Sequence, residues 1–306
     1  MSIFHGDPRD WRIPEAIGSA VAIGTFDGVH RGHQSVLTEL RETPGLVPAA
    51  LTFDVHPSSL VAPDAAPGLL GTVGQRVEWL QQEGAEVVGV LPFHLVREWS
   101  PQAFVDVVLR DALNARVVAV GSDFRFGYGR KGDVAFLASA AEAAGFTVHE
   151  LDLLGEAGGK YSSTEIRRLL GAGDVIGAAG MLGRPPTVRG PVVRGEGRGR
   201  QIGIPTANVA ADPTVLLPAI GVYAGSVLFE GERNDAVVNV GRRPTFDGNG
   251  ITVEAHLIDW DGDLYGRQLD VEFLHRLRGE VKFDGIESLV AQIHADIDAA
   301  RVLLTR

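Results

Sequence analysis

Short apolar runs alternate with helical patterns through the first half of the chain. The apolar runs lie at residues 21–24, 49–53, 87–91, 117–121 and 146–151. Segments with apolar positions at helical spacing lie between or beside them, at residues 75–83, 101–113 and 134–144. Ser100 before Pro101 suits the start of a helix, and Gly145 suits a helix end. Strands that alternate with helices in this way predict a parallel sheet with crossover helices.

The pattern changes beyond about residue 183, after the stiff Gly-Arg-Pro-Pro sequence at 183–186. Turn signals recur at residues 230–231, 247–248, 249–250 and 261–262. Between residues 251 and 257, apolar and polar side chains alternate, with Ile251, Val253, Ala255 and Leu257 on one face and Thr252, Glu254 and His256 on the other. This period of two predicts antiparallel strands. Helical spacing from about Ile286 predicts a C-terminal helix that packs on them. We therefore predict two domains, residues 1–183 and 184–306.

Length and composition agree with two folded domains. The chain has 306 residues, of which 45% are hydrophobic, enough for two apolar cores. It contains no Cys, which excludes disulfides, thiolate metal sites and a thiol nucleophile, and which is compatible with a reducing compartment.

The net charge of the chain limits the classes of partner that it is expected to bind. The formal net charge of -11 argues against general binding to nucleic acid or to an anionic membrane, because both attract a basic surface. The first eleven residues include Asp7, Arg9 and Asp10 and lack the apolar core of a signal peptide, and no apolar stretch has transmembrane length. We expect a cytoplasmic protein that acts on small molecules, and the sequence leaves self-association open.

Residues 24–33, which read Gly-Thr-Phe-Asp-Gly-Val-His-Arg-Gly-His, have the layout of a nucleotide phosphate site. Gly24 and Gly28 permit a tight turn after the first apolar run, and a helical pattern begins near His30. His30 and His33 are three residues apart, so both rings reach one face of the helix N-terminus, where backbone N–H groups favour an anion. The structural alternative is a capping histidine and an unrelated surface histidine.

Two further segments follow apolar runs at the carboxyl edge where open α/β sheets bind ligands. Residues 52–57 read Thr-Phe-Asp-Val-His-Pro, and a buried turn histidine is an equally good interpretation of His56. Residues 121–127 include Asp123 and Phe124, with Arg130 and Lys131 beyond, and suit a planar ring beside a phosphate. Residues 127–132 also match a dinucleotide fingerprint, but this match is weak because the first glycine does not directly follow the strand.

A run of hydroxyl side chains opens another helix. Ser162 and Glu165 have the spacing of a capping box. Capping alone does not require Ser163 and Thr164 as well, with Arg167 one turn onward. Hydroxyls, helix N–H groups and a guanidinium that converge on one point suit a pyrophosphate leaving group.

The second half carries a glycine-rich basic segment at residues 190–208. Its glycines let backbone N–H groups approach phosphates, and Arg194, Arg198 and Arg200 supply charge. A flexible basic surface loop is the alternative, but it does not account for Thr206 and Asn208, which offer hard oxygen ligands to a magnesium–nucleotide complex. No Walker A pattern is present in the sequence. Glu254 is either a solvated carboxylate or a proton acceptor for phosphoryl transfer.

Taken in order, these motifs resemble a known family over essentially the whole chain. They read G-T-F-D-G-V-H-R-G-H, T-F-D-V-H-P, D-F-R-F-G, S-S-T-E-I-R, L-G-R-P, G-I-P-T-A-N, G-V-Y-A-G, V-E-A-H-L-I-D and L-Y-G-R. The chain resembles the bifunctional prokaryotic riboflavin kinases and FAD synthetases. The resemblance implies a Rossmann-like FMN adenylyltransferase domain at 1–183 and, at 184–306, a riboflavin kinase domain built as a six-stranded antiparallel β-barrel with a C-terminal helix. It also implies ATP and Mg²⁺ in both steps, from riboflavin to FMN and from FMN to FAD and pyrophosphate.

The resemblance also implies a role for particular residues. His30 and His33 would bind the ATP phosphates, and Glu254 would act as general base on riboflavin. The remaining ATP ligands of the adenylyltransferase would be Gly24, Phe26, Asp27, Ser162, Ser163, Thr164 and Arg167, and its flavin ligands His56, Asp123 and Phe124. The kinase would bind ATP through Gly195, Gly197, Gly199, Gly203, Thr206 and Asn208, of which Thr206 and Asn208 would hold the metal. Residues 277–283 resemble the family's mobile flap.

Departures from the family pattern occur at Val55, Tyr161, Pro186, Ile204 and Ile220, and none replaces a proposed catalytic side chain.

Two other hypotheses about the function stay open at this point. One is a related histidine-signature transferase with a different phosphate acceptor, whose barrel only binds ligand. The other is a flavin-binding regulatory protein without turnover.

Overall fold

The computed structural model describes residues 1–14, 16–151, 161–195, 197, 199, 202–245 and 248–305, without the side chains of 243–245 and 248–250. The chain forms two compact units. The first comprises Met1–Pro67 and Val73–Ser162, and the second comprises Gly68–Thr72 and Ser163–Arg306. The boundary that we predict between residues 183 and 184 concerns the two activities rather than these compact units, and it stays a prediction.

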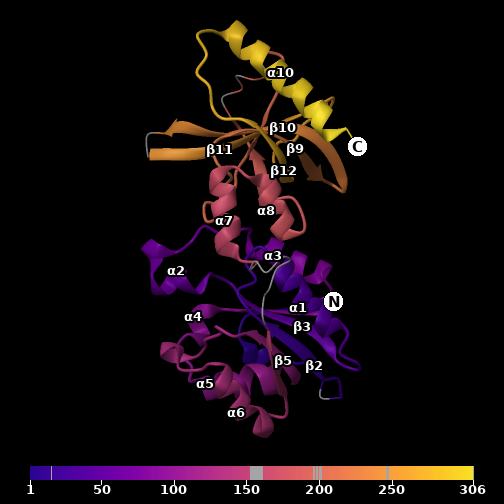
Figure 1. Ribbon diagram of the computed structural model, residues 1–306, viewed down its shortest axis with the longest axis vertical. Coiled ribbons are helices and arrows are strands. Elements are labelled where there is room, and N and C mark those ends of the chain that lie inside the picture. Colours follow the sequence, from indigo (N-terminus) through magenta and orange to yellow (C-terminus); the bar gives the residue numbers. More distant parts are fainter. Residues whose placement is uncertain are drawn as a thin grey trace. The chain divides into compact units, whose positions relative to one another are not determined.

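A parallel six-stranded sheet forms the centre of the first unit (Figure 1). Its strands lie in the order β1-β4-β3-β2-β5-β6. Their bounds are β1 (Ser2–His5), β2 (Ser19–Ile23), β3 (Val47–Phe53), β4 (Val87–Leu91), β5 (Ala115–Gly121) and β6 (Thr147–Leu151). Every residue of β2 and β4 is buried, as expected for central strands that are covered on both faces. The five predicted strands are confirmed, and the edge strand β1 was missed.

Helices cover both faces of this sheet because neighbouring strand residues point to opposite sides. Ala20 and Ala22 of β2 pack with α1 (Arg31–Arg41) and α3 (Val73–Gln82). Val21 and Ile23 pack instead with the π-helix η3 (Val105–Ala112), which continues α5 (Pro101–Phe104). The remaining helices of this unit are η1 (Pro8–Asp10), α2 (Pro57–Val61), η2 (Pro63–Ala65), α4 (Phe93–Val96), η4 (Tyr128–Arg130) and α6 (Val134–Ala144).

The predicted helix ends are confirmed by their caps. Ser100 Oγ accepts a hydrogen bond from the backbone N–H of Ala103 at 3.1 Å, and Pro101 occupies the first helical position. Gly145 ends α6 in the left-handed conformation with φ 79°. Such caps satisfy backbone groups that a helix end would leave unpaired.

A closed antiparallel barrel forms the centre of the second unit, with strand order β10-β11-β8-β7-β12-β9. Its strands are β7 (Thr187–Val193), β8 (Ala207–Val209), β9 (Gly221–Phe229), β10 (Glu232–Thr245), β11 (Gly248–Leu257) and β12 (Gln268–Arg278). The C-terminal helix α10 (Ile286–Leu304) lies against the barrel (Figure 1). Its Ile297 and Ala300 pack against Val222 and Ala224 of β9. The predicted fold class, a parallel α/β unit followed by a six-stranded barrel and a helix, is confirmed.

The barrel interior extends onto two helices that precede it in the chain. Ile166 and Leu170 of α7 (Ser163–Ala172) and Leu182 of α8 (Val175–Leu182) share one apolar cluster with the inward side chains of the barrel. Of the residues predicted to alternate in β11, Val253, Ala255 and Leu257 are buried as expected, whereas Ile251 is half exposed. Ile251 lies near the β10–β11 turn, beyond the part of β11 that β8 covers.

The segment Gly68–Thr72 also belongs to the second unit. The backbone N–H of Leu69 donates to Thr214 O at 2.7 Å, and that of Leu216 donates to Leu69 O at 2.8 Å.

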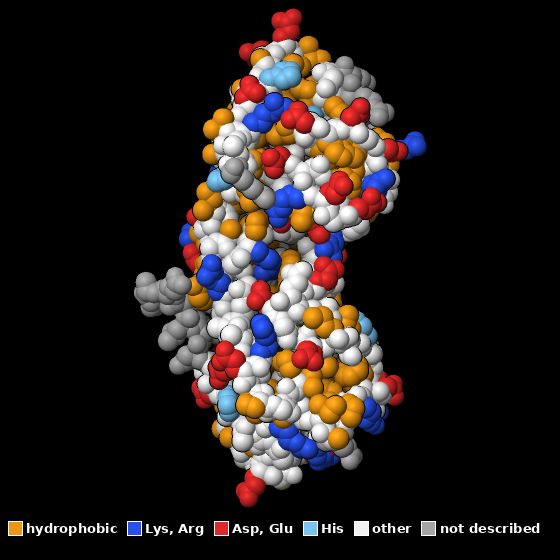
Figure 2. All heavy atoms as spheres, turned by 90° about the vertical axis from the view of Figure 1, so that its right-hand side faces the viewer, with side chains coloured by type: hydrophobic (Ala, Val, Ile, Leu, Met, Phe, Trp, Pro, Cys, Tyr) orange, Lys and Arg blue, Asp and Glu red, His pale blue; other side chains and the backbone are white. Residues whose placement is uncertain are grey.

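Among the described residues, no helix is both long and apolar enough to cross a membrane. On the face seen in Figure 2, Lys and Arg side chains are interspersed with Asp and Glu and form no continuous basic surface.

Candidate active sites

The first candidate site follows β2 at the point where the strand order of the sheet reverses. From β2 the chain continues to β3 and β4 on one side, and β5 then pairs with the other side of β2. The carboxyl ends of β2 and β5 therefore form the crevice in which open α/β sheets bind ligands. The segment Gly24–His30 and the loop with Asp123 and Phe124 both begin at these strand ends.

The turn between β2 and α1 has an uncommon backbone. Phe26 has φ 49°, Gly28 has φ 80° and Val29 has φ 38°. For residues other than glycine such angles cost of order 1–3 kcal/mol each and persist only where the surroundings hold them. The Phe26 ring lies over Gly24, where an added Cβ would be 3.4 Å from the ring. This strained turn sets the entry of His30 into the helix.

His30 and His33 lie together at the N-terminus of α1, as the sequence predicts. Their rings are stacked with centroids 3.7 Å apart and planes 16° from parallel. His30 is only 2% exposed and occupies the N-cap position, but its side chain makes no cap hydrogen bond, so capping does not explain it. The Phe26 ring meets His33 edge-on at 5.1 Å. A helix N-terminus with two imidazoles on one face suits a phosphate group.

Tyr161 closes one side of the histidine pair. An added Cβ at Gly32 would lie 3.3 Å from both the His30 ring and Tyr161 Cβ, so a larger residue at this position would require these neighbours to move by a few tenths of an ångström. Ser162 follows in the same compact unit, whereas Ser163, Thr164 and Arg167 of α7 belong to the second unit. Arg167 Nε donates to Gly68 O at 2.7 Å, and Glu165 pairs with Arg168 at 2.6 Å. That these residues share one triphosphate with the histidines stays a prediction.

The predicted flavin ligands of the first unit have different surroundings. His56 is the N-cap of α2, and its Nδ1 lies 2.6 Å from Ser58 Oγ. This contact is also that of a turn histidine, but the side chain is only partly buried, and the role of His56 as a flavin ligand stays a prediction. Asp123 is exposed just beyond β5, and the Phe124 ring stacks on Phe126 with centroids 5.3 Å apart. An accessible aromatic face beside a carboxylate suits a planar ring.

The glycines of residues 127–132 do not open a helix as a dinucleotide fingerprint would. Gly127 and Gly129 have φ of 71° and 65° around the short η4, and α6 starts only at Val134 with Asp133 as its cap. The weak match is therefore coincidental.

The second glycine-rich segment, residues 190–208, is described only in part. Arg198 and Arg200 lie outside the described residues, and so do residues 196 and 201.

The second candidate site lies on the outer face of the barrel. Strand pairing places Glu254 of β11 directly opposite Asn208 of β8 on one side and Asn239 of β10 on the other. Paired residues of antiparallel strands point to the same face, with Cβ atoms roughly 5 Å apart. The three side chains therefore form one row, each half-buried, and Thr206 lies just before the first residue of β8.

Glycines of the preceding loop approach this row closely. An added Cβ at Gly195 would lie 2.7 Å from Asn208 Oδ1, and one at Gly199 would lie 3.4 Å from Thr206 Oγ1. His256 Nδ1 lies 2.8 Å from Pro205 O and so joins β11 to the segment with Thr206 that leads into β8. The structure thus brings Gly195 and Gly199 of the glycine-rich segment close to Asn208 and Thr206, whereas an added Cβ at Gly203 would meet open space.

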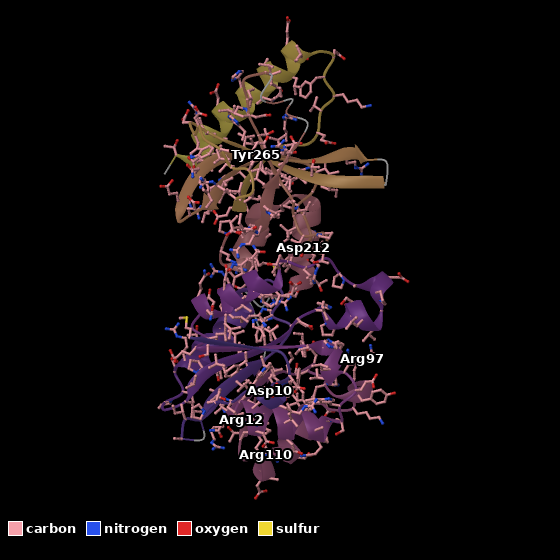
Figure 3. All side chains as sticks on the ribbon, turned by 180° about the vertical axis from the view of Figure 1, so that it is seen from behind. Asp10, Arg12, Arg97, Arg110, Asp212 and Tyr265 are labelled. Carbon is pink, nitrogen blue, oxygen red and sulfur yellow. The ribbon has the colours of Figure 1, made fainter. Side chains whose placement is uncertain are left out.

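A cavity of about 240 Å³ adjoins the row. Thr206, Asn208 and the loop glycines line its polar side, and Leu257, Trp260 and Leu264 line its apolar side. Tyr265, labelled in Figure 3, completes the wall, and the Arg194 guanidinium lies 5.9 Å from its ring. A pocket with an apolar slot beside polar oxygen atoms and close backbone suits a nucleotide.

Together these features define a two-domain transferase of phosphate-containing groups, with one site on a parallel sheet and another on a barrel. Family models match both halves: FAD synthetase matches residues 13–165, and riboflavin kinase matches residues 182–304. The chain belongs to the bifunctional riboflavin kinase/FMN adenylyltransferase family.

Individual relatives agree with this assignment. The bifunctional riboflavin kinase/FMN adenylyltransferase of Pseudomonas fluorescens is 40% identical, covering 95% of this chain and 94% of its own. That of Haemophilus influenzae is 36% identical over 93% of this chain and 94% of its own. A crystal structure from Streptococcus pneumoniae, described as a macrolide-efflux protein, superposes with a TM-score of 0.86 at 31% identity and covers 98% of both chains. The activity in that description differs from the activity named for the other relatives, and the likeness is one of fold.

Two residues of these sites escaped the sequence analysis. Asn239 lies beside Glu254 only through strand register. Arg76 of α3 is 1% exposed and donates to Thr52 Oγ1 and Phe53 O near the turn that precedes His30. Neither belongs to a motif of the sequence, although an arginine inside an amphipathic helix pattern is a weak signal of a buried charge.

Proposed function

We propose that this chain phosphorylates riboflavin with ATP to give FMN, and then transfers AMP from a second ATP to FMN to give FAD and pyrophosphate. The observation that carries the proposal is that each half matched by a family model holds a group of residues suited to phosphate, the stacked His30 and His33 in one and the row of Asn208 and Glu254 in the other. Riboflavin, FMN, FAD and ATP are its small-molecule substrates and products. Its location in the cytoplasm, and the expectation that it binds neither nucleic acid nor membranes, stay predictions from composition.

The adenylyl transfer belongs to the N-terminal half of the chain, which the FAD synthetase family model matches over residues 13–165. A phosphate oxygen of FMN attacks the α-phosphorus of ATP, and the bond from that phosphorus to the pyrophosphate oxygen breaks. His30 and His33 donate to the phosphate oxygens and stabilise the charge that develops there, with the N-terminus of α1 behind them. Positioning and electrostatics suffice, so no covalent intermediate on the protein is needed. Gly24, Phe26, Asp27, Ser162, Ser163, Thr164 and Arg167 complete the ATP site in this proposal.

The phosphoryl transfer belongs to the barrel. The 5′-hydroxyl oxygen of riboflavin attacks the γ-phosphorus of ATP, ADP leaves, and Glu254 accepts the hydroxyl proton. Asn208 and Asn239 on either side of Glu254 offer amide hydrogen-bonding groups that orient its carboxylate. ATP occupies the cavity of about 240 Å³, with its phosphates toward Thr206 and Asn208.

The residues at the kinase site fit a magnesium ion. Thr206 Oγ1 and Asn208 Oδ1 are hard oxygen donors on one face, and Gly195 and Gly199 leave space beside them. The described residues hold no cluster of three or more His, Cys, Asp or Glu, so phosphate and water oxygens would complete the coordination, as is usual for Mg²⁺. When bound, the ion neutralises phosphate charge during transfer.

A single added methyl group tests the kinase site. Gly195→Ala is expected to lower the rate of FMN formation about 10²-fold, because its Cβ would displace the Asn208 amide. Gly180→Ala in α8, where an added Cβ meets open space, is the matched control and should leave the rate unchanged. Both variants should convert supplied FMN to FAD at the parent rate. Full kinase activity in Gly195→Ala would show that Asn208 does not serve ATP.

The test of the whole proposal is separation by chromatography of the products formed from riboflavin, ATP and Mg²⁺. The proposal requires FMN to appear first and FAD to follow. Tight flavin binding with neither product would favour the regulatory alternative, and FAD synthesis from FMN without riboflavin phosphorylation would favour a transferase whose barrel only binds ligand.

A further inference from the structure

A buried arginine lies beneath the turn that leads to the histidine pair. Arg76 projects from α3 and is 1% exposed. Its Nη1 donates to Thr52 Oγ1 at 3.2 Å and to Phe53 O at 2.9 Å, both at the carboxyl end of β3. Burial lowers the pKa of the guanidinium, and the nearby charge of Asp27 partly opposes that shift. Burying a charge in this way is costly, and apolar residues of similar volume are often as stable or more so.

The hydrogen bonds of Thr52 have only one consistent direction. A guanidinium can donate but cannot accept, so Thr52 Oγ1 is the acceptor from Arg76. The hydroxyl proton of Thr52 is then directed to Thr25 O, which lies 3.0 Å away. Thr52 itself is fully buried. A directional chain of hydrogen bonds therefore runs from α3, across the end of β3, to the turn after β2.

The acceptor at the end of this chain is next to the strained residues of the turn. The carbonyl of Thr25 belongs to the peptide that joins it to Phe26, whose φ is 49°. The Phe26 ring meets the His33 ring at 5.1 Å, and His33 stacks on His30 at 3.7 Å. Holding the Thr25 carbonyl thus restrains the orientation of the Phe26 ring, which in turn supports one side of the histidine pair.

We propose that Arg76 and Thr52 are positioning residues for FMN adenylylation, which hold the Thr25–Phe26 peptide so that the rings of His30 and His33 point at the ATP phosphates. They act through the turn and contact no substrate. This inference rests on the proposed role of the two histidines. It differs from a purely structural role, because the loss of the hydroxyl chain lowers turnover more than it lowers stability.

Two substitutions of one buried residue separate the hydroxyl from the shape of the side chain. Thr52→Val keeps the volume and removes the hydroxyl, whereas Thr52→Ser keeps the hydroxyl and removes a methyl group. We expect Thr52→Val to lower kcat for FMN adenylylation about tenfold with a smaller change in the KM for ATP, since a misplaced catalytic group loses rate steeply. Thr52→Ser should retain most of the parent kcat. Riboflavin phosphorylation, measured in the same samples, should be unchanged.

The role of Arg76 is tested by asking whether its effect on kcat adds to the effect of the Thr52 substitution. Arg76→Met should lower the same kcat, and the double variant Arg76→Met with Thr52→Val should be little slower than the slower single variant, because residues of one network do not act independently. Thermal unfolding is followed for each variant. If Arg76→Met unfolds the first unit, the comparison of Thr52→Val with Thr52→Ser still decides the matter.

The outcomes distinguish this inference from the proposed function. Adenylylation at the parent rate in a folded Thr52→Val variant overturns the inference, and so does an equal loss in Thr52→Val and Thr52→Ser that follows their loss of thermal stability. If the variant that lacks both His30 and His33 still makes FAD, the role of the histidines itself is wrong. A loss confined to Thr52→Val, with the kinase intact, supports the positioning role.

Discussion

Replacing His30 and His33 together with alanine is expected to abolish FAD formation while FMN formation continues. The two rings are stacked at the N-terminus of α1, where the phosphates of ATP are proposed to bind. Loss of one preorganised donor to a developing charge typically costs about 10²–10³ in rate, so loss of both should lower adenylylation by about 10⁴ or more. The measurement is the initial rate of FAD formation from supplied FMN and ATP.

This prediction has an internal and an external control. The riboflavin kinase rate of the same double variant reports whether the barrel is folded, and its thermal unfolding compared with the parent reports on the first unit. His149→Ala, which changes a half-exposed histidine of β6 in the same unit, should leave both rates unchanged. Retention of FAD synthesis in the double variant would remove the histidines from the mechanism.

Glu254→Gln is expected to stop FMN formation from riboflavin while FAD formation from supplied FMN continues. The carboxylate is proposed to accept the proton of the riboflavin hydroxyl, and removal of a general base costs typically about 10²–10⁴ in rate. The substitution preserves the shape of the side chain between Asn208 and Asn239, so the barrel should remain folded. Adenylylation of supplied FMN should proceed at the parent rate. The measurement is FMN formation from riboflavin and ATP, with Glu254→Ala as the stronger truncation.

Glu232→Gln is the matched control for this second variant, since Glu232 is an exposed carboxylate of the same barrel. It should leave FMN formation unchanged. A Glu254→Gln variant that still phosphorylates riboflavin at the parent rate would show that Glu254 is the solvated carboxylate that the sequence analysis kept as an alternative.

Much of the parallel sheet could be predicted because its central strands are covered on both faces and therefore appear as continuous apolar runs. The edge strand β1 gives no such signal, since only one of its four residues is even partly buried. Its place beside β4 depends on pairing across more than eighty residues of chain. The pairing of Leu69 with the second unit is likewise invisible in local patterns.

The candidate sites were predictable where their residues are close in the sequence. His30 and His33 lie in one turn at the start of a helix, and Thr206 precedes by two residues Asn208 of the short strand β8, so their closeness in sequence keeps them close in space. Asn239 joins Glu254 only when β10 and β11 are in register, and Arg76 reaches Thr52 only once α3 packs on the sheet. The difference is one of range: spacing along the chain predicts neighbours within an element, whereas partners across elements follow from tertiary packing.

The central claim is that one chain carries two independent phosphate sites with separate chemistry. The most direct test follows riboflavin, ATP and Mg²⁺ over time by chromatography in three samples: the parent, His30→Ala with His33→Ala, and Glu254→Gln. The account predicts FMN and FAD from the parent, FMN alone from the histidine variant, and no product from Glu254→Gln unless FMN is supplied, in which case FAD forms. Loss of both activities in either folded variant would contradict it.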